Sequence, residues 1–296
     1  KINILKMKNQ KVKFSIIREK EKLVGNSGCK LNIFKDKVFK IRKQSTNNLN
    51  SVRLLSQYEK ILKFKNFKKI SVPKIYNYKK SKKYFHYDME YINGSTLSLF
   101  LMTQPLSESI NVFKDVINFI FSCKKSSFSK YKNIVFVKKI QDIEKKNIFT
   151  NNFFKKIFKF LNNYNWNNIE NSQSHGDLSL ENVIIKNQTI KFIDLSENFV
   201  DSYKLDISKI MFDLISCWSF RKVSLKMDSL KVYSIKMHLL EVFIKKLSRD
   251  DFEDIKMLII LDFLRVLQYT KDINEINLLE KQLKIFYDNI NNPLRW

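Results

Sequence analysis

The stretch "SHGDLSLENVIIKNQTIKFIDLSEN", residues 174–198, constrains the fold more than any other part of this chain. Between positions 175 and 182 it brings together a His, a Gly, an Asp and an Asn. Two runs of β-branched residues follow, separated by Asn187 and its neighbour Gln, which predicts a hairpin over residues 183–194. Asp194 ends the second strand. The chain must therefore place a polar loop, a hairpin and a second polar turn next to one another.

Composition sets broad limits on the kind of protein. With 296 residues, 44% of them hydrophobic, the chain can bury a substantial core in one large domain or two lobes. A formal net charge of +26 is typical of proteins that bind nucleic acid or an anionic membrane surface. The excess, however, consists of lysines scattered among many Asn and Ile, with only seven arginines, a usage typical of an A/T-rich genome. We therefore interpret the charge as composition and expect no nucleic-acid partner.

The cysteines indicate a reducing compartment. Cys29, Cys123 and Cys217 are odd in number and lack metal-ligand spacing, which argues against a disulfide framework. No apolar run reaches the length of a membrane span, and the first residues show neither the apolar core nor the cleavage site of a signal peptide. We expect a cytoplasmic protein.

Residues 1–92 are predicted to form a small lobe of five strands and one helix. Runs of β-branched and aromatic residues alternate with turns, and one stretch has apolar positions near helical period. Asn93, Gly94 and Ser95 break this pattern, so the lobe boundary is placed between residues 92 and 93. The predicted elements are a short strand before a loop at about 25–28, strands at about 29–34, 37–43, 74–80 and 83–92, and a helix within 46–67.

Residues 93–296 are predicted to be mainly helical, with the hairpin as the exception. Together the two lobes predict a two-lobed α+β architecture. Helices are expected at about 95–103, at 107–122, at 139–164 with a possible break near Asn151, and in four stretches between 206 and 290.

The polar groups of the opening stretch match what phosphoryl transfer requires. That reaction needs a carboxylate to receive the proton of the acceptor hydroxyl, and oxygen ligands to hold Mg²⁺ against the phosphates. Asp177 offers the carboxylate, Asn182 an amide oxygen five residues later, and Asp194 a charged ligand after the hairpin. His175 is better explained as a residue that anchors the loop than as a base.

With these residues, the chain resembles the protein-kinase-like small-molecule phosphotransferases, which include aminoglycoside phosphotransferases and choline/ethanolamine kinases. The resemblance covers nearly the whole chain, and its motifs are "HGDLSLEN", "FIDLSEN" and "MEYINGSTL". "GNSGCK", "IRKQS" and "RLLSQ" are similar to members found in bacterial surface-polysaccharide gene clusters. The resemblance implies the protein-kinase-like fold, with Asp177 as the catalytic base and Asn182 and Asp194 as Mg²⁺ ligands. It also implies that Asp206, in "LDISKIMFDL", braces the catalytic loop.

The resemblance further implies that residues 1–92 bind the nucleotide. Backbone amides of the loop with two glycines would cover its phosphates. Backbone groups of Glu90 and of Tyr91 or Ile92 would hydrogen-bond adenine, and Met89 would lie at the back of the pocket. The candidate nucleotide-binding residues are Gly25, Asn26, Ser27, Gly28, Lys43, Met89, Glu90, Tyr91 and Ile92.

The third strand offers two lysines for the phosphates, Lys40 and Lys43. Because side chains alternate along a strand, Lys43 shares a face with Phe and Ile, whereas Lys40 shares its face with Val and Arg. An apolar face suits the interior, so we favour Lys43. Its partner on the following helix is predicted to be Gln57 or Glu59, and both stay open.

Other polar and aromatic residues have plainer explanations. His86 and His238 lie in apolar stretches without ligand spacing and are interpreted as structural. Glu197 could support the metal site or cap the next segment, and both stay open. Aromatic faces and a carboxylate would suit a cationic acceptor, although helix packing explains the aromatics better. The candidates for such an acceptor pocket are Tyr203, Asp213, Trp218 and Phe220.

The leading hypothesis is a small-molecule kinase that uses ATP, or another nucleoside triphosphate, with Mg²⁺. It would transfer the γ-phosphoryl group to a hydroxyl of a sugar, an amino alcohol or a polysaccharide precursor. A protein kinase is disfavoured, because only eleven residues separate Asp194 from Asp206 and no Ala-Pro-Glu follows. The alternative from another class is a non-catalytic module of the same fold whose basic surface binds nucleic acid or anionic lipid.

Overall fold

The computed structural model describes residues 23–24, 29–35, 38–81, 84–124, 129–146, 151–196, 198–221 and 228–296. The chain divides into two compact units. We call the first, Lys1–Asn66 with Ser71–Asn93, the N-terminal unit, and the second, Phe67–Ile70 with Gly94–Trp296, the C-terminal unit. Which of these units binds nucleotide and which carries the catalytic residues stays a prediction.

The described part of the N-terminal unit contains a five-stranded antiparallel sheet in the order β1-β2-β3-β6-β5. Four of the strands coincide closely with the predicted ones, because their alternating apolar residues fit a sheet with one face covered. The strands are β1 (Leu23–Val24), β2 (Lys30–Lys35), β3 (Phe39–Gln44), β5 (Ile75–Lys80) and β6 (Phe85–Glu90).

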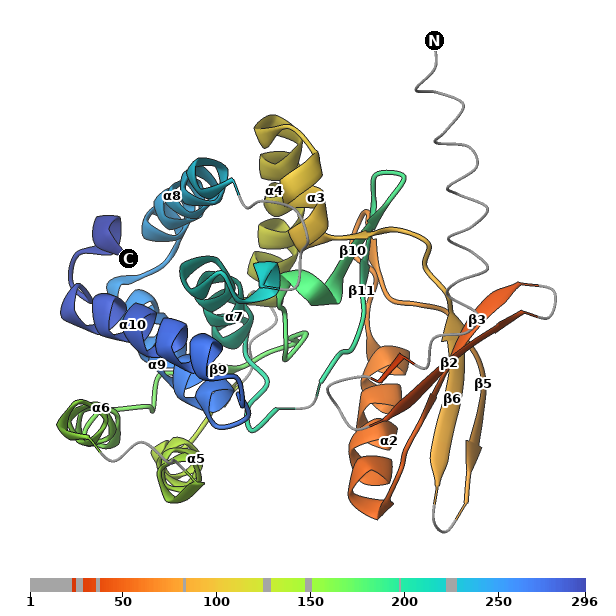
Figure 1. The fold of residues 1–296 in the computed structure, drawn as a ribbon, viewed down its shortest axis with the longest axis horizontal. Coiled ribbons are helices and arrows are strands. Elements are labelled where there is room, and N and C mark those ends of the chain that lie inside the picture. Colours follow the sequence, from red (N-terminus) through yellow and green to blue (C-terminus); the bar gives the residue numbers. More distant parts are fainter. Residues whose placement is uncertain are drawn as a thin grey trace. The chain divides into compact units, whose positions relative to one another are not determined.

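Helix α2 (Asn48–Lys63) packs on this sheet (Figure 1). Asn47 caps it, since its side chain accepts a hydrogen bond from the Asn50 amide at 2.8 Å. Tyr58 joins the helix to the inner strand β6, with its ring centroid 5.5 Å from that of Phe85 and 5.8 Å from that of Tyr87. One face of the helix is therefore fixed against β6.

The C-terminal unit is mainly helical, as predicted. The break expected near Asn151 separates two helices, and Asn151 caps the second one by accepting from the Phe154 amide. The first of them begins at Asn133 rather than at residue 139, which corrects that prediction. The helices are α3 (Leu97–Thr103), α4 (Leu106–Lys124), α5 (Asn133–Lys146), α6 (Asn152–Asn162), α7 (Tyr203–Ser216), α8 (Ser229–Lys246), α9 (Arg249–Leu267) and α10 (Ile273–Asp288).

The predicted hairpin is confirmed. Its strands pair in register around a turn in which Asn187 and Gln188 both have positive φ, at 45° and 62°. Gly94 passes close to it, because a Cβ at this glycine would lie 2.6 Å from the carbonyl oxygen of Ile185. Strand β4 (Ile70–Ser71), whose first residue belongs to this unit, forms one sheet with β7 (Ser95–Thr96), β10 (Val183–Lys186) and β11 (Thr189–Phe192). The other short elements are β8 (Ser129–Lys130), which pairs with β9 (Glu170–Asn171), and the 3₁₀ turns η1 (Leu180–Asn182), η2 (Trp218–Phe220) and η3 (Pro293–Arg295).

Helix α7 is the centre of the C-terminal unit. All of its residues are buried, and it packs along α9, where the Phe212 and Phe263 rings meet edge to face at 4.8 Å. Despite this burial it carries four charged side chains, those of Lys204, Asp206, Lys209 and Asp213. A buried charge is costly unless it is paired, so the neighbours of α7 must supply partners.

Lys204 shows how such a charge is paired. Its ammonium lies 2.7 Å from a carboxylate oxygen of Asp251 and 2.8 Å from one of Asp254, both on α9. The Tyr164 hydroxyl donates to the other oxygen of Asp254 at 2.6 Å. These bonds join α7 and α9 through charged groups within the core.

None of the described helices is long and apolar enough to cross a membrane.

Replacing Lys204 with Met should lower the free energy of unfolding by about 3–5 kcal/mol, because the change leaves two buried carboxylates without this cation. Lys245→Met is the matched control. Lys245 pairs with Glu241 one turn away on the exposed surface of α8, and its loss should have no measurable effect. Urea denaturation measures both changes. Equal effects of the two substitutions would show that the buried cluster does not stabilise the fold.

Candidate active site

The loop that follows β9 and ends at η1 contains the predicted catalytic residues. His175 is fully buried, and its Nε2 lies 2.9 Å from the carbonyl oxygen of Ile193. Its Nδ1 accepts a hydrogen bond from the Asp177 amide at 3.2 Å. Both ring nitrogens therefore fix the loop, which confirms the prediction that His175 is an anchor. Gly176 has φ of 86°, a conformation that favours glycine at this turn.

Asp206 braces this loop from α7, as predicted. Its two carboxylate oxygens accept hydrogen bonds from the backbone amides of His175, at 2.7 Å, and Gly176, at 2.9 Å. The side chain is buried, so these two amides compensate its charge where water does not reach. The backbone of the loop is thus fixed just before Asp177.

Asp177 lies at the accessible side of the loop, with its side chain 44% exposed. The side-chain nitrogen of Asn182, Nδ2, donates a hydrogen bond to the backbone carbonyl of Asp177 at 2.8 Å and lies 3.4 Å from Oδ2 of the same residue. Since Asn182 uses its nitrogen in this way, its Oδ1 is the atom left to act as a metal ligand. An exposed carboxylate and an oriented amide oxygen are thereby held by one short segment.

A lysine that the sequence patterns did not indicate also lies at Asp177, and it is paired with a second carboxylate. The Lys209 ammonium, from α7, lies 3.5 Å from Oδ1 of Asp177 and 3.2 Å from Oδ1 of Asp262, from α9. Desolvation raises the pKa of Asp177, but the positive charges of Lys209 and Arg265 outweigh it and the pKa is lowered. Asp177 is therefore held as a carboxylate. Helical spacing from Asp206 could have indicated Lys209, since residues three apart share a helix face.

Asp194 follows β11 in the left-handed region, with φ of 55°. A non-glycine residue in this region is strained, and such strain occurs often at functional sites. The segment is tied to the catalytic loop, because the Ile193 amide donates to the Asn182 carbonyl and the Ser196 amide to that of His175, both at 3.0 Å. These bonds place the two predicted metal ligands, Asn182 and Asp194, on adjoining segments.

The acceptor-pocket candidates prove to be structural for the most part. Asp213 is buried and accepts from the Leu180 amide at 2.8 Å and from the Ser219 amide at 2.7 Å, so it braces the loop instead of facing an acceptor. Burial raises its pKa. Tyr203 and Phe220 are buried in the core, as helix packing predicts. Trp218 is partly exposed, and the Arg221 guanidinium stacks on its ring at 3.6 Å.

In the N-terminal unit the two lysines of β3, Lys40 and Lys43, have different surroundings. Lys43 is 1% exposed, and its ammonium donates to the side-chain oxygen of Gln57, on α2, at 2.9 Å. Glu59 lies on the exposed side of that helix, so the helix partner is Gln57. Lys40 instead lies over the Tyr76 ring at 4.8 Å. The face assignment made from strand alternation is consistent with this arrangement.

The hinge candidates occupy the end of β6 and the residues after it. Met89 and Ile92 are buried. The amides of Glu90 and Tyr91 already donate, to the carbonyls of Lys74 and Phe39 at 2.8 and 3.2 Å. Within the described chain, the Ile92 amide has no hydrogen-bond partner. Of the amides predicted to bind adenine, that of Ile92 is therefore the available one.

Some candidates lie outside the described residues: Gly25, Asn26, Ser27, Gly28 and Glu197. A metal site built from three or more His, Cys, Asp or Glu side chains does not occur in the described ranges. A Mg²⁺ ion that binds nucleotide phosphates needs only one or two protein ligands, which Asn182 and Asp194 could provide.

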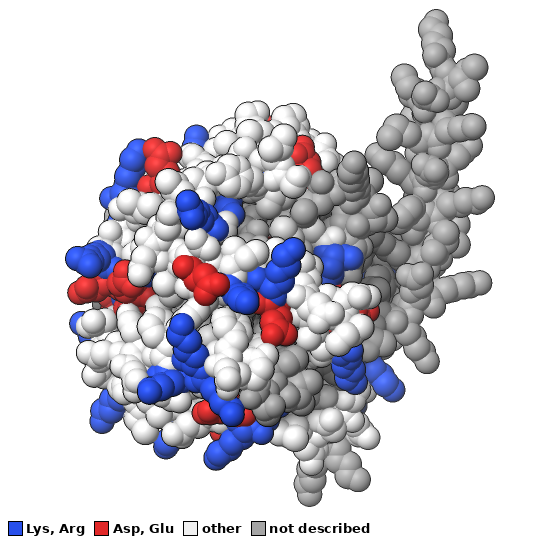
Figure 2. Space-filling model, turned by 60° about the vertical axis from the view of Figure 1, so that its left-hand side comes forward, with Lys and Arg blue, Asp and Glu red and all other residues white. Residues whose placement is uncertain are grey.

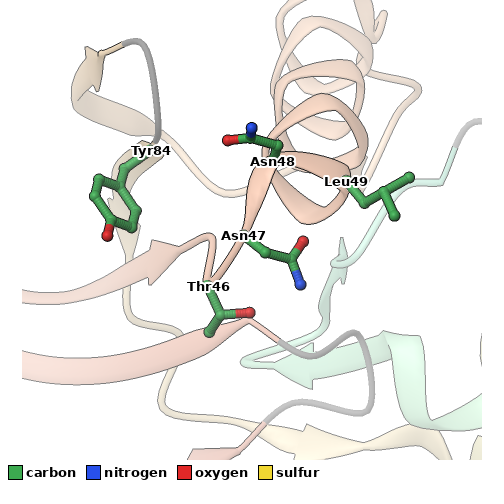
Figure 3. A pocket seen from close by; sticks show the side chains of 5 residues that line it. All are labelled: Thr46, Asn47, Asn48, Leu49 and Tyr84. Carbon is green, nitrogen blue, oxygen red and sulfur yellow. The ribbon is translucent and has the colours of Figure 1, made fainter.

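Two hollows of the surface lie away from these residues. One of about 570 Å³ opens at the start of α2, where the side chains of Asn47, Asn48 and Tyr84 surround it (Figure 3). Another of about 710 Å³ is lined by Phe67, Phe121 and three lysines of the C-terminal unit. No candidate residue lines either one, so we assign no function to these two hollows.

Comparison with known proteins bears on the fold. No protein-family model and no curated protein sequence matches the chain. Among solved structures, a choline kinase from Cryptosporidium parvum Iowa II superposes with a TM-score of 0.57, at 12% identity over 93% of this chain and 91% of that one. APH(2")-IIia, solved with GDP and kanamycin, gives 0.56 at 13% identity over 92% and 93%. An amicoumacin kinase, solved with AMP-PNP and Ca²⁺, gives 0.54 at 12% identity over 99% and 97%.

The chain has the fold of the protein-kinase-like small-molecule phosphotransferases. The predicted fold class, α+β with a small antiparallel-sheet part and a larger helical part, is confirmed. At 12–13% identity the likeness establishes the fold alone.

Asp206→Asn should loosen the catalytic loop. The side chain of Asn has only one acceptor oxygen. The backbone N–H of either His175 or Gly176 would therefore face the NH₂ group of the side chain instead of an oxygen. We expect the free energy of unfolding to fall by about 1–3 kcal/mol. Hydrogen exchange at both loop amides should also become faster. Asp272→Asn is the control, because Asn caps the exposed start of α10 as well as Asp does. Unchanged protection of the loop amides in Asp206→Asn would contradict the bracing role.

Proposed function

We propose that this protein is an ATP- and Mg²⁺-dependent phosphotransferase that moves a γ-phosphoryl group to a hydroxyl of a small molecule. The observation that carries the proposal is the state of Asp177. Its side chain is half-exposed, its pKa is lowered, and the backbone around it is fixed by Asp206 and His175. Positioning is the main task of the protein in phosphoryl transfer, because the reaction involves little covalent work by side chains.

Asp177 is assigned as the general base. It would accept a hydrogen bond from the acceptor hydroxyl, orient that oxygen toward the phosphoryl group and receive its proton late in the transfer. A carboxylate with a lowered pKa is ionised at neutral pH and can take this role throughout the physiological range. His175 has both ring nitrogens engaged in the loop and does not compete for it.

Asn182 and Asp194 are assigned as the residues that would hold Mg²⁺. The nitrogen of the Asn182 side chain is engaged with Asp177, which leaves an oxygen, the atom that Mg²⁺ prefers. Asp194 adds one charged ligand, held in a strained backbone conformation. Bound to phosphates, the ion would neutralise charge that develops during transfer.

Residues of the N-terminal unit are assigned to the nucleotide. Lys43 would contact its phosphates, and Gln57 holds the lysine in position without neutralising its charge. The Ile92 amide would donate to adenine, with Met89 behind the ring. The glycine-containing segment 25–28 would cover the phosphates. One solved neighbour was determined with AMP-PNP, an analogue of ATP, and another with GDP. We propose ATP as the donor because of the similarity to the neighbour that binds AMP-PNP.

A small alcohol is proposed as the acceptor. Two of the solved neighbours are a choline kinase and a protein determined in complex with kanamycin. Choline is an amino alcohol and kanamycin is an amino sugar. Sugars, amino alcohols and polysaccharide precursors are therefore the first compounds to test.

The alternative, a non-catalytic module whose basic surface binds nucleic acid or anionic lipid, rests on the net charge of +26. On the face that Figure 2 displays, Lys and Arg are interspersed with Asp and Glu and do not form one stripe. A phosphate-binding surface would instead gather its cations. Nucleic-acid affinity measured across a salt series separates the two functions, since the module would bind tightly at low salt and lose affinity steeply.

Asp177→Asn should lower the rate of label transfer from ATP by about 10²–10⁴, the usual size of general-base catalysis, and leave Mg-ATP binding nearly unchanged. Asp194→Ala is its counterpart, and should weaken Mg-ATP binding because it removes a charged metal ligand. Titration calorimetry and turnover separate the two effects. Full turnover in Asp177→Asn would remove Asp177 from the reaction, and unchanged Mg-ATP affinity in Asp194→Ala would refute the metal assignment.

Lys43→Ala should lower kcat/KM for ATP at least about tenfold, equivalent to about 1.4 kcal/mol, whereas Lys40→Ala should stay within a few-fold of the wild type. The two residues lie on the same strand, so the pair forms its own control. Steady-state kinetics with varied ATP measures both. A larger loss in Lys40→Ala would transfer the phosphate contact to that residue.

A further inference from the structure

Lys209 occupies an unusual place for a lysine. It lies on a helix that is buried along its whole length, and the residue itself is 7% exposed. Burying an ammonium group costs several kcal/mol unless it is paired, so an apolar residue would be more favourable wherever packing alone mattered. Lys209 instead places its charge beside two carboxylates, those of Asp177 and Asp262.

Asp262 is a fixed anchor for Lys209. It is 1% exposed, and the Ser208 hydroxyl donates to its Oδ2 at 2.8 Å. Its Oδ1 receives both Lys209, at 3.2 Å, and Arg265, at 3.2 Å. With donors on both oxygens, this carboxylate cannot turn, and the Lys209 ammonium is held on it.

Asp177 is therefore approached from two sides. Lys209 lies 3.5 Å from its Oδ1, and the Asn182 amide nitrogen lies 3.4 Å from its Oδ2. Both distances are longer than those of strong hydrogen bonds, so the charge of Lys209 and the dipole of the Asn182 side chain orient the carboxylate without saturating its lone pairs. Each oxygen keeps the capacity to accept a hydrogen bond from a substrate hydroxyl.

We propose that Lys209, anchored on Asp262, is a positioning residue that sets the orientation of the Asp177 carboxylate toward the acceptor hydroxyl. The proposal rests on the proposed function, since the orientation matters only if Asp177 is the base. Lys209 acts through Asp177 and touches neither the nucleotide nor the acceptor. Its loss should therefore affect the rate of transfer and leave nucleotide recognition intact.

Lys209→Met keeps the length and apolar stem of the side chain and removes the charge. We expect kcat for label transfer from ATP, to an alcohol or to water, to fall about 10- to 100-fold, the size typical of a misplaced catalytic group. KM for ATP should stay within about twofold. Lys209→Arg restores a cation and should recover most of the loss. Lys204→Met, a buried lysine on the same helix that pairs away from Asp177, is the matched control and should lower stability without lowering kcat of the folded protein.

A double-mutant cycle tests whether Lys209 acts through Asp177. In an Asp177→Asn background, Lys209→Met should cause no further loss of kcat, because the group that it orients is already gone. Multiplicative losses in the double variant would overturn the proposal, as they would show that Lys209 acts independently.

Crystal structures of the wild type and of Lys209→Met supply a readout that does not depend on activity. The Asp177 carboxylate should rotate away from its wild-type position in the variant, and Lys204→Met should leave it in place. An unmoved carboxylate together with kcat within about threefold of wild type would overturn the proposal. Absence of transfer by the wild type would refute the proposed function instead, and the crystallographic comparison would still decide whether Lys209 positions Asp177.

Discussion

The C-terminal unit depends on one physical constraint, the pairing of charges on a helix that is entirely buried. Helix α7 carries four charged side chains where water cannot solvate them. Three of them, Asp206, Lys209 and Asp213, are spaced three and four residues apart and so lie along one face. All three find partners in the catalytic loop: two backbone amides for Asp206, the Asp177 carboxylate for Lys209 and the Leu180 amide for Asp213.

The catalytic loop and the core are consequently held by the same bonds. If the loop moved away from α7, Asp206 would lose the two amides that donate to it, and Lys209 and Asp213 would each lose one of their partners. Such a loss is costly for charges that water does not reach. Such coupling would suit the proposed phosphotransferase activity, because in phosphoryl transfer the protein contributes mainly position and electrostatics. A fixed loop presents Asp177 and Asn182 in one arrangement before any substrate binds. The bonds that stabilise the fold therefore also preorganise the site.

Local patterns predicted much of this arrangement from sequence. Turn residues and strand alternation predicted the hairpin and the buried position of Lys43, since both depend on neighbours in the chain. Whether Gln57 or Glu59 pairs with Lys43 depends on how α2 is rotated about its own axis where it packs on β6. No local sequence pattern determines that rotation. Lys209 was missed because its partner Asp262 lies on another helix. Asp213 is one of the acceptor-pocket candidates, whereas it braces the loop, because the Leu180 and Ser219 amides meet it only in the folded chain.

Transfer of labelled phosphate from ATP is the most direct test of phosphoryl transfer with Asp177 as the base. Wild-type protein and Asp177→Asn would be incubated with γ-labelled ATP, with and without Mg²⁺, against a panel of sugars, amino alcohols and aminoglycosides. We expect label on at least one alcohol, only when Mg²⁺ is present, and at most about one hundredth of the wild-type rate with Asp177→Asn. Folded wild-type protein that leaves every alcohol unlabelled, or transfer that is equally fast in Asp177→Asn, would contradict it.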